Sequence, residues 1–248
     1  MQKEYNNQLV IGRNPVLELL KSGKQIEKIY LQQGIKGEFE IEMRNLLKGK
    51  NIPVSHVHPA KLNSITNQTH QGVIAVTSLI EYVALEDLID SIFFRGDVPA
   101  LVFLDSITDI RNLGSIIRTA EVLGAQGIIL GSKNTAIINH IAIKASAGAA
   151  FNIPIVKVHS ANNAITTLKN SGISIYASSL DCRQDISKVN FKNPFCVILG
   201  SEDEGITPHL LKISDDEFKI PQFGKTESLN VAVSAGIILY EAVRQRDH

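Results

Sequence analysis

Residues 105–124, DSITDIRNLGSIIRTAEVLG, decide the fold because they join an apolar strand to an amphipathic helix through a polar loop. Two later segments repeat this order: LGSEDEG at residues 199–205 and IPQFGKTESLNVAVSAGIILYEA at residues 220–242. In each, Gly and polar side chains stand between an apolar strand and a helix. Three such loops in one alternating pattern predict a single site assembled from several strand ends.

The chain around these loops alternates between strands and helices from residue 100 onward. Apolar strands are predicted at residues 100–104, 127–130, 153–158, 173–178, 195–199 and 218–221. Helices are predicted at residues 137–145, 163–169, shortly after Pro208 and at 228–246. Near-continuous apolar strands separated by helices indicate a mostly parallel sheet covered on both faces. Ligands of such sheets bind at the carboxyl ends of the strands, where all three loops fall.

The first part of the chain reads as a separate small α/β unit. Strands are predicted at residues 28–31, 53–57 and 72–78, with a helix capped by Asn14 and another at residues 38–48. The polar loop at residues 63–72 can be simply solvated, or can offer hydrogen-bond donors to RNA. We therefore expect an RNA-binding domain at residues 1–78, a linker at 79–98 and a catalytic domain at 99–248.

The charges are unevenly distributed although the formal net charge is zero. Residues 1–75 carry ten Lys and Arg against six Asp and Glu, whereas residues 76–248 carry fifteen against nineteen. A basic front half favours a polyanionic partner, although an excess of four charges can also arise by chance.

The remaining composition excludes several classes of protein. Cys182 and Cys196 lack a CxxC spacing, which is typical of reduced thiols in a cytoplasmic protein. His56 and His58 lie close together but lack further ligands, so no metal site is expected. The first residues show no apolar signal region, and no apolar run is long enough to span a membrane.

The second loop resembles a dinucleotide-binding fingerprint but fails at its middle position. Where G-x-G-x-x-G needs a second glycine, this chain has Glu202, followed by two further carboxylates. Three carboxylates would repel a pyrophosphate that needs bare backbone N–H groups. The loop from Gly200 to Gly205 therefore favours a neutral or cationic ligand, unless it is a purely structural turn.

The first loop leads into a helix with one apolar face, formed by Leu113, Ile116, Ile117 and Ala120. Asn112 is a candidate N-cap of this helix. Arg118, on another face, can form a surface ion pair with Glu121. Beside a strand-end loop, its guanidinium is equally suited to grip a phosphate or a developing alkoxide.

The third loop places Ser228 and Asn230 at the start of an unusually apolar helix, VAVSAGIILY. Ser228 is a candidate N-cap for it. A helix this uniformly apolar is expected to be buried on all faces, either on the sheet or against a second subunit.

Together, the motifs NxGxxxRTAxxxG, GxExxG and IPxxGxxxSLNV, read from Asn112, Gly200 and Ile220, resemble those of the SpoU (TrmH) family. This family consists of RNA ribose 2′-O-methyltransferases of the SPOUT superfamily. The resemblance covers about residues 98–246, with NVAVSAG as a small departure from the usual third motif. The front segments IGRNPVLELL and HQGVIA are similar to the ribosomal-protein-like RNA-binding domain of the bacterial enzymes that methylate a guanosine of 23S rRNA.

The resemblance implies a fold that strand counting does not predict. It is an α/β, SPOUT-type sheet with a C-terminal trefoil knot, preceded by the small ribosomal-protein-like domain. Knots are rare exceptions to the usual rules of topology. In the family the knot binds S-adenosylmethionine, and the matching positions here are Gly200, Ile220 and Leu229.

The resemblance also implies the residues that support catalysis, namely Arg118, Asn112, Glu202, Ser228 and Asn230. The implied reaction is direct methyl transfer to a ribose 2′-oxygen in a homodimeric enzyme that acts on RNA, with 23S rRNA as the expected substrate. Arginine, with a pKa above about 12, is better suited to stabilise the developing alkoxide than to remove the proton. Alternatives are a tRNA 2′-O-methyltransferase and a non-catalytic ribosome-assembly protein that kept the fold. Glu202 argues against a third, a nucleotide-binding dehydrogenase.

Overall fold

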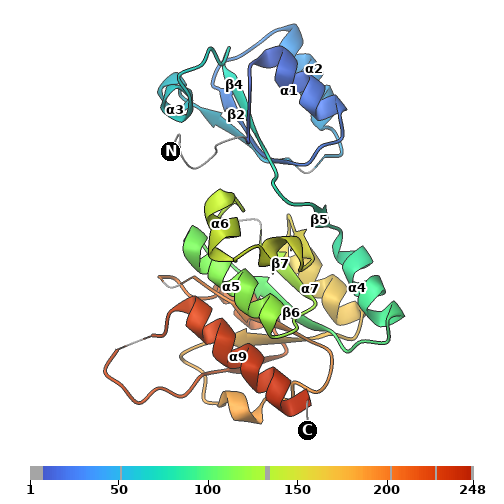
Figure 1. Ribbon diagram of the computed structural model, residues 1–248, viewed down its shortest axis with the longest axis vertical. Coiled ribbons are helices and arrows are strands. Elements are labelled where there is room, and N and C mark those ends of the chain that lie inside the picture. The colour runs from blue at the N-terminus through green and yellow to red at the C-terminus, as the bar shows by residue number, and fades with distance from the viewer. Residues whose placement is uncertain (1–7, 51, 132–134, 202, 227, 247–248) are drawn as a thin grey trace. The chain divides into compact units, whose positions relative to one another are not determined.

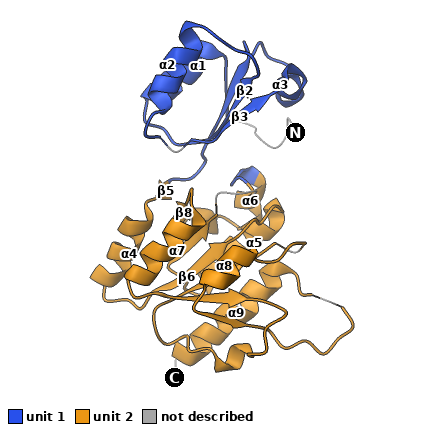
Figure 2. Ribbon diagram, turned by 180° about the vertical axis from the view of Figure 1, so that it is seen from behind, with its two compact units in different colours: residues 1–81, 137–140 blue, residues 82–136, 141–248 orange. Residues whose placement is uncertain are grey.

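The computed structural model describes residues 8–50, 52–131, 135–201, 203–226 and 228–246. The chain forms two compact units (Figure 2). Unit 1 consists of residues 1–81 with 137–140, and unit 2 of residues 82–136 with 141–248.

Within the described residues, unit 1 is a four-stranded sheet in the order β1-β4-β2-β3 with helices on both faces (Figure 1). The β2–β3 pair is parallel, and the other two pairs are antiparallel. Its elements are β1 (Leu9–Ile11), α1 (Arg13–Lys21), β2 (Ile26–Gln32), α2 (Glu38–Leu47), β3 (Val54–Val57), α3 (Pro59–Ile65) and β4 (Val73–Thr77).

The two faces of this sheet have separate cores. The helices α1 and α2 cover one face through a cluster that includes Val16, Leu20 and Ile29. Helix α3 covers the other face, where Leu62 and Ile65 pack against residues of β2 and β4. The strands follow the sequence prediction closely, whereas α3 occupies the start of the segment predicted as a polar loop.

Within the described residues, unit 2 is a seven-stranded, fully parallel sheet in the order β11-β9-β10-β6-β7-β8-β5. Its strands are β5 (Tyr82–Val83), β6 (Ala100–Leu104), β7 (Gly127–Leu130), β8 (Ile155–Lys157), β9 (Ser174–Ser178), β10 (Phe195–Leu199) and β11 (Asp216–Phe218). Its helices are α4 (Leu85–Phe94), α5 (Ile110–Val122), α6 (His140–Ala145), η1 (Ala149–Phe151), α7 (Ala161–Asn170), η2 (Ile186–Lys188), α8 (Pro208–Ile213) and α9 (Val231–Arg246).

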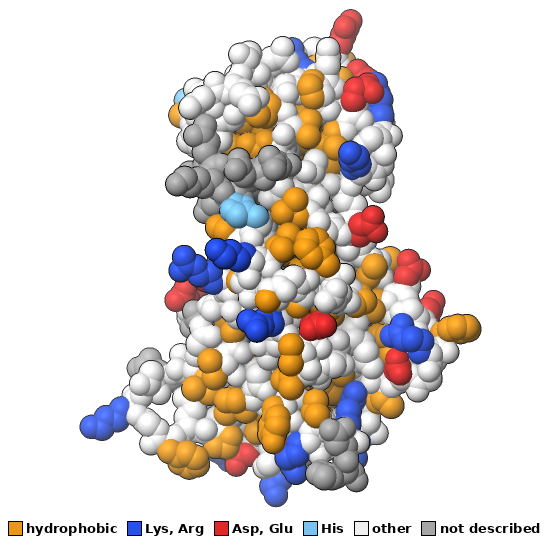
Figure 3. Space-filling model, viewed as in Figure 1, with side chains coloured by type: hydrophobic (Ala, Val, Ile, Leu, Met, Phe, Trp, Pro, Cys, Tyr) orange, Lys and Arg blue, Asp and Glu red, His pale blue; other side chains and the backbone are white. Residues whose placement is uncertain are grey.

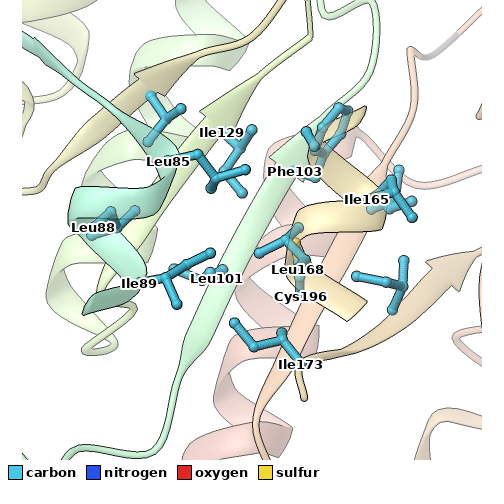
Figure 4. Close-up of a cluster of buried hydrophobic side chains, with 14 of the residues drawn as sticks. Leu85, Leu88, Ile89, Leu101, Phe103, Ile129, Ile165, Leu168, Ile173 and Cys196 are labelled. Atoms are coloured by element: carbon cyan, nitrogen blue, oxygen red, sulfur yellow. The ribbon is translucent and has the colours of Figure 1, made fainter. Parts of the chain in front are cut away.

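Helices cover both faces of this sheet, as the apolar strands predict. On one face α4, α7 and α8 pack over the central strands, in a cluster that includes Leu101, Phe103 and Cys196 (Figure 4). On the other face α5 and α9 lie side by side (Figure 1). Burial raises the pKa of the Cys196 thiol far above its usual range, because the thiolate would lose its hydration.

Several predicted element boundaries are wrong by a few residues. Helix α1 is capped at Gly12 instead of Asn14, and α5 at Asp109 instead of Asn112. The strand predicted at residues 218–221 ends at Phe218, and the last helix starts three residues after Ser228. Such errors arise because several neighbouring polar residues can each cap a helix.

Within this chain the last helix is buried on one face only, and its predicted burial against a second subunit stays a prediction. One face of α9 is buried, but Val233, Ile237 and Tyr240 on the other face are 51%, 36% and 62% exposed. Among the described residues, no helix combines the length and apolar character needed to cross a membrane.

Candidate functional site

The three polar loops emerge at the same edge of the unit 2 sheet. The first follows β6 and the second follows β10, and these two strands are direct neighbours. The third follows β11, which is separated from β10 only by β9. The site predicted from three strand ends therefore has a structural basis, because parallel strands end at a common edge.

A cavity of about 400 Å³ lies at this edge. It is formed by the ends of β9 and β10, the segment after β11 and the first turn of α9. The lining residues predicted to hold the cofactor are Gly200, Ile220 and Leu229, and Ser228 lines the cavity beside them. The structure thus brings together four predicted residues from the second and third loops.

Gly200 is required by the tight fold of the second loop. A Cβ atom built on Gly200 would lie 2.1 Å from the carbonyl carbon of Gly205 and 2.2 Å from the amide nitrogen of Ile206. Backbone hydrogen bonds between Ser201 and Gly205, at 2.9 and 3.2 Å, close the loop. Only a glycine at position 200 therefore allows the second loop to close this tightly.

The buried carboxylate of Asp105 holds this loop in place. Its Oδ2 accepts hydrogen bonds from the backbone nitrogen of Thr207, at 2.8 Å, and from the Thr207 hydroxyl, at 2.6 Å. Its own backbone nitrogen donates to the Leu199 carbonyl, at 2.9 Å. Asp105 therefore ties the end of β6 to both ends of the second loop.

The first and third loops meet through two asparagines. The side-chain nitrogen of Asn230 donates to Oδ1 of Asn112 at 3.1 Å, across 118 residues of sequence. Oδ1 of Asn230 in turn accepts the backbone N–H groups of Ala232 and Val233, so Asn230 caps α9. Asn230, and not Ser228, is therefore the cap of this helix, while Asn112 lies within α5.

Arg118 is exposed on α5, and it is not among the described residues that line the cavity. In the described part of the chain it forms no ion pair with Glu121, three residues further along the helix. Glu202 lies outside the described residues. The structure thus joins Asn112 to Asn230 and leaves Arg118 accessible from solvent.

The charge of the cavity fits a cationic ligand. Its described lining includes the carboxylates of Asp181, Asp203 and Glu204, and no described Lys or Arg. Apolar side chains from Ile206, Leu211 and Val231 supply the rest of the wall. A small molecule with an apolar or aromatic part and a positive centre matches this lining.

Sequence reasoning missed the end of β9 and the segment after it, which contribute Ser178, Ser179, Leu180 and Asp181 to the cavity. The signal was present, since a predicted strand ends there in polar residues, but no recognised motif covers it. It also missed the bond between Asp105 and Thr207, which lie 102 residues apart.

In unit 1, the predicted RNA-binding loop is held by its own polar groups. The Gln71 side chain accepts the backbone N–H of Arg13 at 3.0 Å, and Nε of Arg13 donates to the Gln71 carbonyl at 3.2 Å. His70 lies 2.9 Å from the Asn63 side chain. Arg13 and Gln71, from the motifs GRN and HQG, therefore lie together at the surface.

Fold and cavity together are typical of α/β proteins that bind a small ligand where their parallel strands end. Comparison with known proteins identifies the family to which the chain belongs. Residues 99–240 match the model of the SpoU rRNA methylase family, and residues 9–83 match that of the RNA 2′-O ribose methyltransferase substrate-binding domain. The chain belongs to the SpoU rRNA methylase family.

Individual relatives agree over almost the whole chain. A Bacillus subtilis protein named for the TrmH family of tRNA/rRNA methyltransferases is 32% identical, with 96% of each chain covered. A Synechocystis protein named a tRNA/rRNA methyltransferase is 36% identical over 96% of this chain, which spans only 62% of that relative.

Solved structures show the same fold. The SpoU methyltransferase AviRb from Streptomyces viridochromogenes, in complex with AdoMet, is 26% identical with a TM-score of 0.61, covering 96% of this chain and 90% of its own. An AdoMet-bound rRNA methyltransferase from Sinorhizobium meliloti is 27% identical with a TM-score of 0.60, covering 96% and 87%. AdoMet is S-adenosylmethionine, the cofactor predicted from the sequence. The predicted family and α/β fold class are confirmed, whereas the knot stays a prediction.

Proposed function

We propose that this chain transfers a methyl group from S-adenosylmethionine to a ribose 2′-hydroxyl of RNA, with a guanosine of 23S rRNA as the substrate. The observation that carries the proposal is the cavity at the strand ends, which gathers Gly200, Ile220, Ser228 and Leu229. The matched families and the printed names of the relatives support RNA as the substrate class.

The charge of the cavity lining supports S-adenosylmethionine as its ligand. The backbone around Gly200, together with Ile220 and Leu229, would hold the nucleoside. The carboxylates on the cavity lining favour a ligand with a positive centre. When bound, the cofactor supplies a methyl group already activated by its sulfonium. The protein then has to align the acceptor and stabilise the charge that develops on it.

Arg118 is proposed to stabilise the developing alkoxide, or a phosphate next to it, with its guanidinium. The side chain is exposed on α5 and forms no ion pair with a carboxylate of the described residues, so it can approach RNA. An arginine stays protonated at neutral pH, and therefore the proton of the hydroxyl leaves through water or phosphate.

Asn112 is proposed to orient Arg118 or the acceptor ribose, and Ser228 and Asn230 are proposed to hold the nucleotide. Of these three residues, Ser228 lines the cavity. The hydrogen bond between Asn112 and Asn230 fixes the first loop against the start of α9. Glu202 is proposed to orient Arg118 or the ribose, on the strength of its place in the second motif.

Residues 1–78 are proposed to bind the RNA substrate and residues 99–248 to carry out the reaction. The linker predicted at residues 79–98 contains β5 and α4, which pack into the sheet and core of unit 2. The substrate-binding model matches residues 9–83. A homodimer is proposed to form over the exposed apolar face of α9. The cysteines Cys182 and Cys196 are free thiols, which supports action in the reducing cytoplasm.

The test is methyl transfer from labelled S-adenosylmethionine to unmodified 23S rRNA and to bulk tRNA transcripts, followed by mapping of 2′-O-methyl groups. We expect label at a single guanosine of 23S rRNA. Arg118→Ala should lower the rate by about 100-fold or more, because the charge on the transition state is left uncompensated.

The other outcomes separate the parts of the proposal. Label in tRNA alone would replace the substrate and keep the chemistry. A rate for Arg118→Lys near that of the wild type would exclude a role for the guanidinium fork. If S-adenosylmethionine is not bound, the chain is not a methyltransferase, and a role in RNA binding alone would take its place.

A further inference from the structure

Outside the cavity, α5 and α6 carry a cluster of exposed cations that the proposed chemistry does not fully use. On α5, Arg111, Gly114 and Arg118 are spaced three and four residues apart and therefore share one side of the helix. Arg111 and Arg118 are exposed, while Gly114 between them is buried. The buried glycine marks the point where another helix crosses.

That helix is α6, and it passes Gly114 at very short range. A Cβ atom built on Gly114 would lie 2.6 Å from the Cβ of Ala145 and 2.6 Å from the carbonyl oxygen of Ala142. Lys144, the neighbour of Ala145, is exposed. Figure 3 shows Lys and Arg side chains gathered over α5, beside α6. Arg111, Arg118 and Lys144 are called here the α5–α6 basic patch.

None of these three cations is neutralised within the described part of the chain. Arg111, Arg118 and Lys144 form no ion pair there within 4.0 Å, in contrast to the Arg244–Glu241 and Lys169–Asp215 pairs elsewhere in unit 2. The carboxylate of Asp109 is engaged in capping α5, where it accepts two backbone N–H groups at 2.8 Å. The patch therefore presents positive charge to solvent.

The patch begins beside the candidate site. Arg111 precedes Asn112, whose side chain accepts the hydrogen bond from Asn230. Asn230 in turn follows Leu229, on the cavity wall. Along α5, Arg111 and Arg118 are separated by seven residues, which corresponds to about 10 Å. A strand of RNA that reaches the cavity can therefore contact several members of the patch.

We propose that Arg111 and Lys144 bind backbone phosphates of the substrate RNA next to the nucleotide that is methylated. Arg118 lies on the same surface and acts on the acceptor ribose. This inference rests on the proposed function, to which it adds two residues and a path for the RNA strand. Phosphates suit the patch because unpaired, exposed guanidinium and ammonium groups bind them without the cost of breaking an existing ion pair.

The experiment compares the full-length wild type with the double variant Arg111→Ala/Lys144→Ala. Binding of an unmodified 23S rRNA transcript is measured over a range of salt concentrations, without catalysis. Each phosphate contact contributes about 0.7 to the slope of log K against log salt for single strands. We expect the slope to fall by about 1.4 and the RNA affinity to fall by about tenfold or more.

Two kinds of control separate a phosphate contact from a general effect. Lys192→Ala/Lys212→Ala removes two other exposed lysines of unit 2 and should leave the slope unchanged. Arg111→Lys/Lys144→Arg keeps both charges and should restore most of the affinity. S-adenosylmethionine binding and thermal stability of the Arg111→Ala/Lys144→Ala variant should match the wild type.

A slope unchanged in Arg111→Ala/Lys144→Ala, or lowered equally in the Lys192→Ala/Lys212→Ala control, would overturn the inference. Failure of the proposed function would give a different result. In that case the wild-type protein would bind RNA but would neither bind S-adenosylmethionine nor transfer methyl groups. The salt dependence of RNA binding is read independently of that result.

Discussion

At the scale of single residues, Gly200 sets the shape of the cavity. Its place against the backbone of Gly205 and Ile206 leaves no room for a side chain. Gly200→Ala should push the second loop outward, destabilise the protein by about 1–3 kcal/mol and weaken S-adenosylmethionine binding by about 100-fold. Isothermal titration calorimetry and urea unfolding measure the two effects. Gly236→Ala, where the added Cβ would meet Thr119 at 3.6 Å, should change neither by much.

Asp105 holds the end of the second loop through its hydrogen bonds to Thr207. Removing its carboxylate in Asp105→Ala takes away the charged acceptor of two Thr207 hydrogen bonds, at a cost of about 1.5–3 kcal/mol. Urea denaturation should report that loss, and cofactor affinity should fall with it because the loop is released. Thr207→Ser keeps the hydroxyl and should stay within about 1 kcal/mol of the wild type. An Asp105→Ala protein as stable as the wild type would show that this clamp contributes nothing.

At the scale of elements, α9 has two faces with different surroundings. Its inner face packs beside α5, while Val233, Ile237 and Tyr240 form an exposed apolar stripe at positions i, i+4 and i+7. If that stripe is the dimer interface, Ile237→Glu should produce a monomer, because a carboxylate would be buried without a partner. Light scattering should then give a mass near 27.2 kDa, against about twice that for the wild type.

The matched control for this prediction is Phe94→Glu, which alters an exposed apolar residue on α4, on the other face of the sheet. It should leave the dimer intact. A wild-type mass of one chain, at concentrations where the enzyme is active, would contradict the proposed homodimer.

The elements also show how far sequence reasoning extends. The strands β6, β7 and β10 fall where they were predicted, because a strand buried on both faces is apolar without interruption. Helix starts were less certain, since Asp109 and Asn112 are equally good caps and only the fold decides between them. The contacts that shape the site, such as Asp105 with Thr207, join distant residues and leave no local pattern.

At the scale of the whole molecule, the two units are proposed to divide the work of an RNA methyltransferase between substrate binding and cofactor binding. Unit 2 supplies every described lining residue of the cavity, a sheet with helices on both faces and the clamp made by Asp105. Unit 1 has separate cores of its own on the two faces of its sheet. Such independent cores are what allow domains to fold separately.

A chain restricted to residues 82–248 should therefore fold and bind S-adenosylmethionine with an affinity close to that of the full-length protein. Its affinity for 23S rRNA should fall by about tenfold or more, because the contacts supplied by residues 1–78 are lost while the α5–α6 basic patch remains. The remaining salt dependence of RNA binding should still respond to Arg111→Ala/Lys144→Ala. Calorimetry with the cofactor and filter binding with RNA measure the two affinities. Undiminished RNA binding by residues 82–248 would show that unit 1 is not the substrate-binding domain, despite its match to the substrate-binding family model.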